Sequence, residues 1–391
     1  MVLRKINKIF YFSVSRSDYY ITYNLLSYLA SKKNLKINTV ITGMHYAKIF
    51  GNTKDNLIHN KKISQHKIPV DYKNCNFMDK DILSISTKFI NSISFFLKKK
   101  KPKIIMLLGD RYETFLIAYC ATIYKIPIIH IHGGELTLGS YDDNFRHSIT
   151  KMSHWHLSAT QKSKKRIIQL GENKKNVFNI GSLSLDNIKK TSILNYKILS
   201  NKFNIDEDKE LVLMTYHPTT LNAKKDNSNI HNIINFLKKE NFFVIITAPG
   251  ADTGSSKLKK LILHKIKKLK NFKFINNLGF QNYISLLKCS KFLIGNSSSG
   301  IIEAPLLNKI SINVGDRQKL REISPTILNI DGSVKSLKGI LKKISKKEKI
   351  NFKINSTLFP YYKKDPIKTA GNIISKIKIP ENCIKKFYTK N

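Results

Sequence analysis

The sequence predicts an α/β fold in which two Rossmann-like, doubly wound domains face each other across a cleft. Apolar, strand-like runs alternate with longer helical patterns along the chain, which is typical of βαβ units and parallel sheets. The 391 residues are too many for one ordinary core and suit two domains. A polar, lysine-rich stretch at 186–208 interrupts the pattern, which then restarts. We therefore expect one domain over residues 1–185 and another over 186–391, whose last helix can pack back on the first.

Six apolar runs in the first half are expected to be strands. They cover residues 8–14, 37–42, 104–108, 126–131, 155–158 and 177–180. The first run follows basic residues, as in a weak signal peptide. We interpret it as a strand because it is short, lacks a small-residue cleavage site and leads directly into the polar turn 15–18. Apolar residues at helical spacing predict helices at 82–97 and 161–170. No apolar segment is long enough to span a membrane.

The same alternation of strands and helices follows the connection. Strands are expected at residues 211–216, 242–247, 272–276, 292–294 and 310–314, with a helix at 281–289. Glycine or proline closes most of these strands. If the two domains face each other, the carboxyl ends of their strands share one cleft, which is a common position for ligand sites.

The composition restricts the classes of partner. A formal charge of +43 ordinarily suggests nucleic acid. Here, however, the lysines are spread over the whole chain, and the densest basic run, 98–103, follows a predicted helix. We therefore expect no nucleic-acid partner, although the charge can attract an anionic substrate. The cysteines show neither metal-ligand spacing nor a paired framework, which favours a reducing cytoplasm; they are Cys75, Cys120, Cys289 and Cys383.

Chemically capable side chains are most concentrated between residues 109 and 147. Asp110 ends one apolar strand, a diglycine and Glu135 end the next, and two further aspartates follow. Any one of these carboxylates alone would more often be a helix cap. Because neighbouring strand ends meet at one edge of a parallel sheet, and because histidines are interleaved with the carboxylates, we interpret the group as a site. The catalytic candidates are Asp110, His132, Glu135, Asp142, Asp143 and, at a strand end in the second half, His217.

The histidines also leave a metal site as an alternative. Alternation puts His130 and His132 on one face of the predicted strand, and Asp110 could join them. We rank this reading below proton transfer because no compact ligand motif such as HExxH is present. We therefore expect no metal.

Two turns in the second half suit a phosphate group. The run GNSSSGIIEAP, 295–305, is a strand end, a hydroxyl-rich turn and a helix start, where amide groups bind anions well. The alternative is simple capping of the helix by a serine. Arginine is scarce beside lysine, so the arginines at strand ends carry more weight as phosphate ligands. The binding candidates are Arg16, Arg111, Ser297, Ser298, Ser299, Glu303, Arg317 and Arg321.

Six motifs in this order resemble those of a known family. They are GDRYE, HIHGGE, YDDNFRHSITKMSH, YHPTT, IGNSSSGIIEAP and VGDRQKLRE. Together they are similar to the hydrolysing UDP-N-acetylglucosamine 2-epimerases of sialic and legionaminic acid pathways. The resemblance implies a glycosyltransferase-B type fold that binds the nucleotide mainly in the second domain, no metal or NAD cofactor, and a homodimer. It also implies elimination of the nucleotide across C1–C2 to a 2-acetamidoglucal, followed by addition of water, which releases a free 2-epimeric sugar.

The resemblance also implies roles for individual residues. Asp110 and Asp142, with Asp143 adjacent, match catalytic carboxylates, and His217 matches a histidine of the second domain. The positions that match nucleotide contacts are Arg16, Gln281, Ser297, Ser298, Glu303 and Arg321. One departure is that His132 stands where some members have a catalytic glutamate. The base at C2 is therefore either His132 or Glu135.

Two other functions compete with this interpretation. A glycosyltransferase of the same fold would also bind a nucleotide sugar at the serine-rich turn, but it would not explain the carboxylates of the first half. A nucleic-acid-binding protein, suggested by the charge alone, ranks far below both. The sequence leaves open whether the nucleotide is UDP or GDP, and whether the sugar is N-acetylglucosamine or a 2,4-diacetamido-6-deoxy relative.

Overall fold

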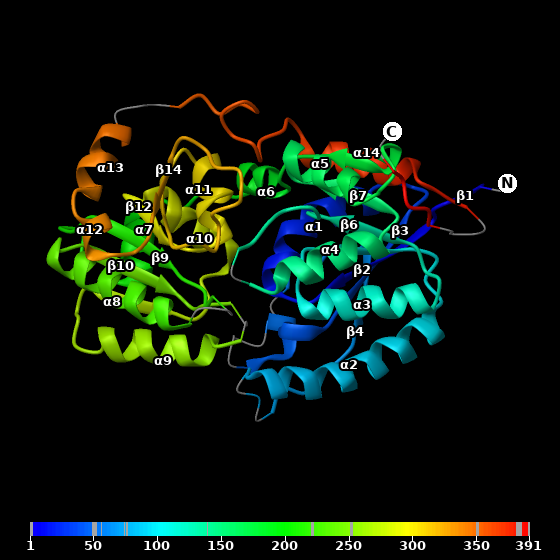
Figure 1. The fold of residues 1–391 in the computed structure, drawn as a ribbon, viewed down its shortest axis with the longest axis horizontal. Coiled ribbons are helices and arrows are strands. Elements are labelled where there is room, and N and C mark those ends of the chain that lie inside the picture. Colours follow the sequence, from blue (N-terminus) through cyan, green and yellow to red (C-terminus); the bar gives the residue numbers. More distant parts are fainter. Residues whose placement is uncertain are drawn as a thin grey trace.

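The protein is described by a computed structural model that covers residues 3–48, 53–55, 57–73, 75, 77–138, 140–219, 223–250, 253–348, 352–380 and 385–389. Two bodies lie side by side, each built around a parallel sheet, with helices on both faces of each sheet (Figure 1). The predicted fold class is confirmed. Cys383 and Thr220, which belong to the cysteine set and to the YHPTT motif, lie outside the described residues. None of the helices in the described ranges combines the length and apolarity needed to cross a membrane.

The first sheet has seven parallel strands in the order β4-β3-β2-β5-β6-β7-β8. Their bounds are β2 (Lys8–Ser13), β3 (Lys36–Ile41), β4 (Ile63–Lys67), β5 (Ile105–Leu108), β6 (Ile128–Ile131), β7 (Trp155–Ser158) and β8 (Val177–Asn179). Six of them coincide with expected strands. Strand β4 was not expected, because its sequence ISQHK is mostly polar; it lies at the edge of the sheet and is only half-buried.

Helices cover both faces of the first sheet and close two apolar cores on it. They are α1 (Arg16–Ala30), α2 (Asp79–Lys100), α3 (Tyr112–Ile123), α4 (Asp142–Met152) and α5 (Gln161–Gln169). One core packs α1 against the sheet and the other packs α2 and α3, with Phe10 and Phe96 in T-shaped contact at 6.0 Å. This burial fixes the sheet and, with it, the positions of the loops at the strand ends.

The second sheet has six parallel strands in the order β11-β10-β9-β12-β13-β14. Their bounds are β9 (Leu211–Thr215), β10 (Phe243–Thr247), β11 (Phe272–Ile275), β12 (Phe292–Gly295), β13 (Ile310–Val314) and β14 (Ile327–Ile330). The helices of this body are α8 (Ala223–Lys239), α9 (Ser255–Ile266), α10 (Gly279–Cys289), α11 (Glu303–Leu306), α12 (Val334–Leu337) and α13 (Ile340–Glu348). Edge strand β14 was not expected either, since ILNI is short and only its first residue is fully buried.

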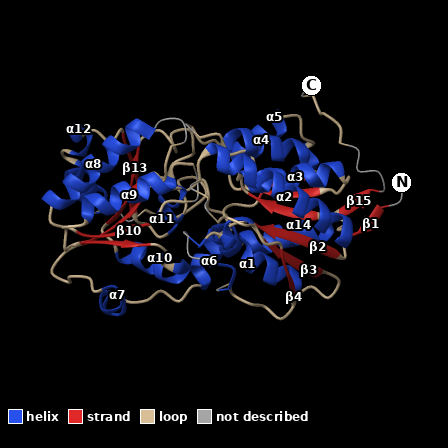
Figure 2. Ribbon diagram, turned by 90° about the horizontal axis from the view of Figure 1, so that it is seen from below, coloured by secondary structure: helices blue, strands red, loops and turns tan. Residues whose placement is uncertain are grey.

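The strand order defines where each body can bind a ligand. In both sheets the strand order reverses direction in the middle, between β2 and β5 in the first and between β9 and β12 in the second. At such a switch point the loops on the two sides diverge and leave a crevice beyond the carboxyl ends of the strands. The interface between the bodies is filled mainly by loops, which Figure 2 shows between the two groups of strands. The two crevices therefore open toward each other.

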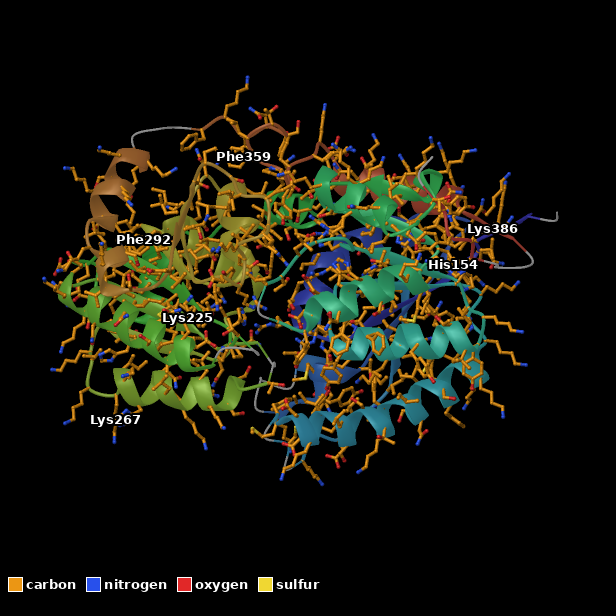
Figure 3. The ribbon with its side chains drawn as sticks, in the orientation of Figure 1. His154, Lys225, Lys267, Phe292, Phe359 and Lys386 are labelled. Atoms are coloured by element: carbon orange, nitrogen blue, oxygen red, sulfur yellow. The ribbon has the colours of Figure 1, made fainter. Side chains whose placement is uncertain are left out.

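The two bodies are joined by more than one segment of chain. The expected connection at 186–208 contains helices α6 (Ser184–Lys190) and α7 (Tyr196–Phe203). Near the end of the chain, α14 (Pro366–Lys376) returns to the first body and packs against α1. Strand β15 (Lys378–Pro380) then pairs antiparallel with β1 (Leu3–Lys5). Figure 3 shows Lys386 and His154 in the body of the first sheet, far from Phe292 of the second.

Candidate active site

A cavity of about 450 Å³ lies between the two bodies, at the crevices that the strand orders define. Both switch points contribute to its lining. All of the site residues expected from the sequence line it, except Asp143 and Gln281. Asp143 lies just behind the lining, as described below. The side chain of Gln281 is exposed and donates to the carbonyl of Ser192 at 2.9 Å.

The turn after β2 presents Arg16 to the cavity. Ser15 caps α1, and Asp18 accepts hydrogen bonds from the amides of Val14 and Ser15, which fixes the turn. Burial raises the pKa of Asp18 to about 6 despite these hydrogen bonds. Nη1 of Arg16 is buried and has no hydrogen-bond partner among the described residues. A guanidinium at a helix N-terminus with one nitrogen open for a hydrogen bond is suited to an anion.

Arg146 on α4 holds the carboxylates of the first body together. Its guanidinium pairs with Asp110 and with Asp143, and it donates to the Glu135 carbonyl and to Thr137 Oγ1, each at 2.9 Å. Its side chain is 1% exposed. Burial alone would raise the pKa of Asp110, but the charge of Arg146 and its hydrogen bond lower the pKa below its usual value. Asp110 is therefore held as a carboxylate at the cavity wall.

The helix-cap alternative does not describe these aspartates. The N-cap of α3 is Arg111, and Asp110 contacts Arg146 instead of the helix amides. Asp142 is the first residue of α4, after the N-cap Tyr141, and no side chain caps that helix. Asp143 accepts from the Thr137 amide at 2.7 Å, which ties the preceding loop to α4. Asp110 and Asp142 thus line the cavity, and Asp143 supports it through its contacts with Thr137 and Arg146.

His132 lies just beyond β6 in a conformation that is rare for a residue with a Cβ. Its φ is +61°, in the left-handed region, and such strain is concentrated at functional sites. The following turn needs glycine, because a Cβ on Gly134 would meet the Ser163 carbonyl at 2.4 Å. Nε2 of His132 is buried without a hydrogen-bond partner among the described residues, and burial lowers the pKa of the ring. His132 is therefore a neutral imidazole at the cavity wall.

The expected pairing of His130 with His132 on one strand face is wrong. The chain turns at His132, so only His130 belongs to β6. His130 is fully buried; its Nε2 lies 2.8 Å from the Gly109 carbonyl and its Nδ1 3.3 Å from Thr150 Oγ1. Burial lowers its pKa to about 3. His130 is thus a neutral structural residue. In the described part of the chain, no three His, Cys, Asp or Glu side chains are arranged to hold a metal ion.

The serine-rich turn of the second body follows β12. Gly295 has φ +144°, and a Cβ there would lie 1.9 Å from the Thr215 carbonyl, so the turn requires glycine. Ser297 Oγ accepts from the Ser299 amide at 3.3 Å, and Ser299 Oγ accepts from Tyr283 Oη at 2.7 Å. These contacts hold the hydroxyl-rich turn at the cavity. Glu303 accepts from Ser184 at 2.7 Å, and burial raises the pKa of its carboxyl.

His217 follows β9 at the second switch point. The Gly250 amide donates to its Nδ1 at 2.8 Å, and the amide of His217 itself donates to Asn296 Oδ1 at 2.7 Å. An accepting Nδ1 places the proton of a neutral ring on Nε2. The ring of His217, which lines the cavity, is in this tautomer a hydrogen-bond donor at Nε2.

Contacts across the cavity join the loop after β13 to the loop before α4. Arg321 Nη2 lies 3.0 Å from Glu135 Oε2, and Arg317 Nη2 lies 3.9 Å from Asp142 Oδ2. Tyr141 Oη lies 3.1 Å from Thr253 Oγ1. The two bodies thus meet at the carboxylates themselves. Both arginines come from the VGDRQKLRE motif.

One residue at the centre of the site was not among the expected site residues. Arg146 was noted only as part of the motif YDDNFRH, yet it pairs with the carboxylates of Asp110 and Asp143 and donates to the backbone carbonyl of Glu135. The signal that could have found it is its spacing: Asp143 and Arg146 stand three residues apart on one helix face, where side chains meet. An arginine shortly after two adjacent aspartates in a lysine-rich chain is a further sign.

The two parallel sheets with helices on both faces, and the cavity lined from both bodies, define the class as a two-body α/β protein with a cavity between its sheets. Comparison with known proteins gives the family. Residues 27–378 match the UDP-N-acetylglucosamine 2-epimerase family. The chain is 36% identical to the polysialic acid biosynthesis protein P7 of Escherichia coli, with 97% of each chain covered. The chain belongs to the UDP-N-acetylglucosamine 2-epimerase family, and the resemblance seen in its motifs is confirmed.

Other similar proteins support the same assignment. The chain is 38% identical to the hydrolysing GDP/UDP-N,N'-diacetylbacillosamine 2-epimerase of Campylobacter jejuni, over 87% of this chain and 88% of that one. Among solved structures, UDP-GlcNAc 2-epimerase from Neisseria meningitidis bound to UDP-GlcNAc superposes with a TM-score of 0.76 at 19% identity. That match covers 95% of this chain and 100% of the other. At this identity it shows that the fold is shared.

Proposed function

We propose that this protein is a hydrolysing 2-epimerase. It converts UDP-N-acetylglucosamine, or a related nucleotide 2-acetamido sugar, to a free sugar of the N-acetylmannosamine type and a nucleoside diphosphate. The observation that carries the proposal is the meeting of two different groups of side chains in one cavity. Carboxylates and His132 come from the first body, and the serine-rich turn, His217 and two arginines come from the second.

The proposed reaction has two steps. In the first, a base takes the proton from C2, the C1–O bond breaks, and the electron pair of the C–H bond forms the C1=C2 double bond of a glycal. The nucleoside diphosphate leaves with the electrons of the C1–O bond. In the second, the electron pair of the double bond takes a proton from an acid at the opposite face of C2, the oxygen of water bonds to C1, and a base takes a proton from that water. Each step needs a base and an acid, which a mixed group of carboxylates and histidines can supply.

The geometry supports a division of these roles. Asp110 is kept ionised by Arg146, so it suits proton acceptance or stabilisation of a developing positive charge at C1. His217 can donate its Nε2 proton to a departing phosphate oxygen. Asp142 is adjacent to Asp143 at the start of α4, where a carboxylate can deliver or accept the second proton. The nucleotide is assigned to Arg16, Arg111, Ser297, Ser298, Ser299, Glu303 and Arg321, which line the cavity.

The base at C2 is His132 or Glu135. Both line the cavity, and each has one buried atom without a hydrogen-bond partner in the described part of the chain, Nε2 of His132 and Oε1 of Glu135. The variants His132→Gln and Glu135→Gln distinguish them. The variant that abolishes exchange of the C2 hydrogen with solvent removes the base.

Relatives suggest the range of substrates. One similar protein takes part in polysialic acid biosynthesis and another acts on GDP- or UDP-diacetylbacillosamine, so we propose a role in making a sialic or legionaminic type of acid. The nucleotide, UDP or GDP, and the substituents of the sugar are what an assay must determine. A homodimer and a cytoplasmic location remain predictions.

The test is to incubate the protein with a panel of UDP- and GDP-linked 2-acetamido sugars in D₂O, without an acceptor. We expect a free sugar that carries deuterium at C2 and, in H₂¹⁸O, labelled oxygen at C1, because the nucleoside diphosphate leaves with its own oxygen. Activity should survive exhaustive treatment with EDTA. Protium retained at C2 would indicate simple hydrolysis or hydride transfer. A product still attached to its nucleotide would indicate a non-hydrolysing epimerase, and consumption only with an acceptor would indicate a glycosyltransferase.

A further inference from the structure

The two arginines after β13 have partners within the protein. Arg321 donates from Nε to the Leu136 carbonyl at 3.3 Å and pairs through Nη2 with Glu135 at 3.0 Å. The side chains of Arg321 and Glu135 are 9% and 6% exposed, so solvent screens this pair weakly. Arg317 reaches Asp142 at 3.9 Å in a looser contact and donates to the Asn296 carbonyl at 3.3 Å.

A diphosphate in this cavity would compete for the same cations. Arg321 lines the cavity together with the serine-rich turn, and a planar guanidinium fork matches phosphate oxygens as well as it matches a carboxylate. A diphosphate placed beside an intact Glu135–Arg321 pair would also face the negative charge of Glu135. If Arg321 turns to the diphosphate, the guanidinium gains a doubly charged partner, and the carboxylate of Glu135 is left without its cation.

We propose that Arg321 is a shared cation that pairs with Glu135 while the cavity is empty and with the diphosphate of the substrate when the cavity is filled. This exchange of Arg321 between Glu135 and the diphosphate rests on the proposed function, which supplies the diphosphate. Its consequence is that substrate binding itself releases Glu135. The released carboxylate has a buried Oε1 and lies in the same loop as His132, within the group that handles the C2 proton. Proton transfer is thereby coupled to the presence of the nucleotide.

The test measures the affinity of UDP, and in parallel of GDP, by calorimetry for wild type, Glu135→Gln, Arg321→Gln and the double variant. Glu135→Gln should bind the nucleotide about tenfold more tightly, because a charge-assisted contact no longer has to be broken first. Arg321→Gln should bind it more weakly. The double variant should bind the nucleotide no more tightly than Arg321→Gln alone, because Arg321 is the group for which the carboxylate of Glu135 and the diphosphate compete.

The chain offers a matched control on the same loop. Asp316 pairs with Lys225 at 2.8 Å on the exposed surface and does not line the cavity, so Asp316→Asn should leave nucleotide affinity unchanged. Thermal unfolding of every variant shows whether it is folded. If Glu135→Gln is not folded, Glu135→Asp replaces it in the test. This variant shortens the side chain and loosens the pair with Arg321, so it should give a smaller gain in nucleotide affinity.

Two results would overturn the exchange. One is nucleotide binding by Glu135→Gln that is equal to or weaker than that of wild type. The other is a gain in nucleotide affinity from Glu135→Gln that is the same whether or not Arg321 is present. General repulsion between the carboxylate and the nucleotide would then explain the gain. If the folded wild type binds neither UDP nor GDP, the proposed function fails together with the exchange. If wild type binds and turns over a nucleotide sugar while Glu135→Gln shows no gain, only the exchange fails.

Discussion

At the scale of single residues, the site depends on one buried cation. Arg146 satisfies Asp110, Asp143, the Glu135 carbonyl and Thr137 with the five donors of a guanidinium in one plane. A lysine has the same charge but cannot reach all of these acceptors at once. The arrangement of the acidic cluster therefore depends on the shape of this side chain as well as on its charge.

Arg146→Lys should consequently lower both stability and turnover. The side chains of Asp110 and Asp143 are 27% and 24% exposed, so leaving one of them without its partner costs about 2 kcal/mol of unfolding free energy. Urea unfolding measures this loss, and turnover should fall because the pKa of Asp110 rises when its hydrogen bond is lost. The control is Lys291→Met, which removes the exposed pair with Glu210 and should cost at most about 1 kcal/mol. Equal, small losses for both variants would show that Arg146 does not organise the cluster.

At the scale of elements, α4 is held at both ends. Its N-terminal turn carries the aspartates of the site, and its C-terminal carbonyls accept from Lys385, which belongs to the last residues of the chain. Lys385 and Lys151 also donate to Glu172 Oε1, each at 2.8 Å, and His156 Nε2 lies 3.1 Å from its Oε2. A cation at a helix C-terminus stabilises the helix. Lys385 thus supports the helix that carries Asp142 and Asp143, the aspartates proposed to be catalytic.

This contact predicts a dependence of stability on pH. Burial would raise the pKa of Glu172, but hydrogen bonds from His156, Lys151 and Lys385 lower it to about 2 from a usual value of 4.5. Since the folded pKa is the lower one, the stabilisation is present above pH 4.5 and is lost as the pH falls toward 2. It amounts to roughly 3 kcal/mol. Urea unfolding of wild type and Glu172→Gln should therefore differ most near pH 7, with a gap that narrows below pH 4.5.

The matched control for this pH dependence is Glu210→Gln. Glu210 is an exposed carboxylate paired with Lys291, so its removal should leave the pH profile of stability close to that of wild type. A gap between wild type and Glu172→Gln that stayed constant down to pH 3 would mean that the cluster acts through packing and not through the ionised carboxylate.

At the scale of the whole molecule, the alternation of apolar runs and helical patterns was enough to predict two doubly wound sheets. Buried strands such as β9 (LVLMT) and β12 (FLIG) are almost continuous apolar runs, whereas edge strand β4 is mostly polar and edge strand β14 is short and only partly buried, so neither gave such a signal. The strand-end rule also placed most of the site residues at one cavity. The left-handed turn at His132 and the pairing of Arg321 with Glu135 could not be predicted, because each depends on contacts distant in sequence.

The facing domains predict a division of labour that kinetics can test. Asp110 and Asp142 come from the first body and Ser298 from the second, and all three line the cavity. Asp110→Asn and Asp142→Asn should lower kcat by about 10²-fold, the usual scale for proton-transfer groups, with little change in nucleotide affinity. Ser298→Ala should chiefly raise KM, because it removes a donor that serves bound and reacting nucleotide alike. If the aspartate variants instead keep kcat and lose only stability, Asp110 and Asp142 are structural, and the chemistry must be assigned to His132, Glu135 and His217.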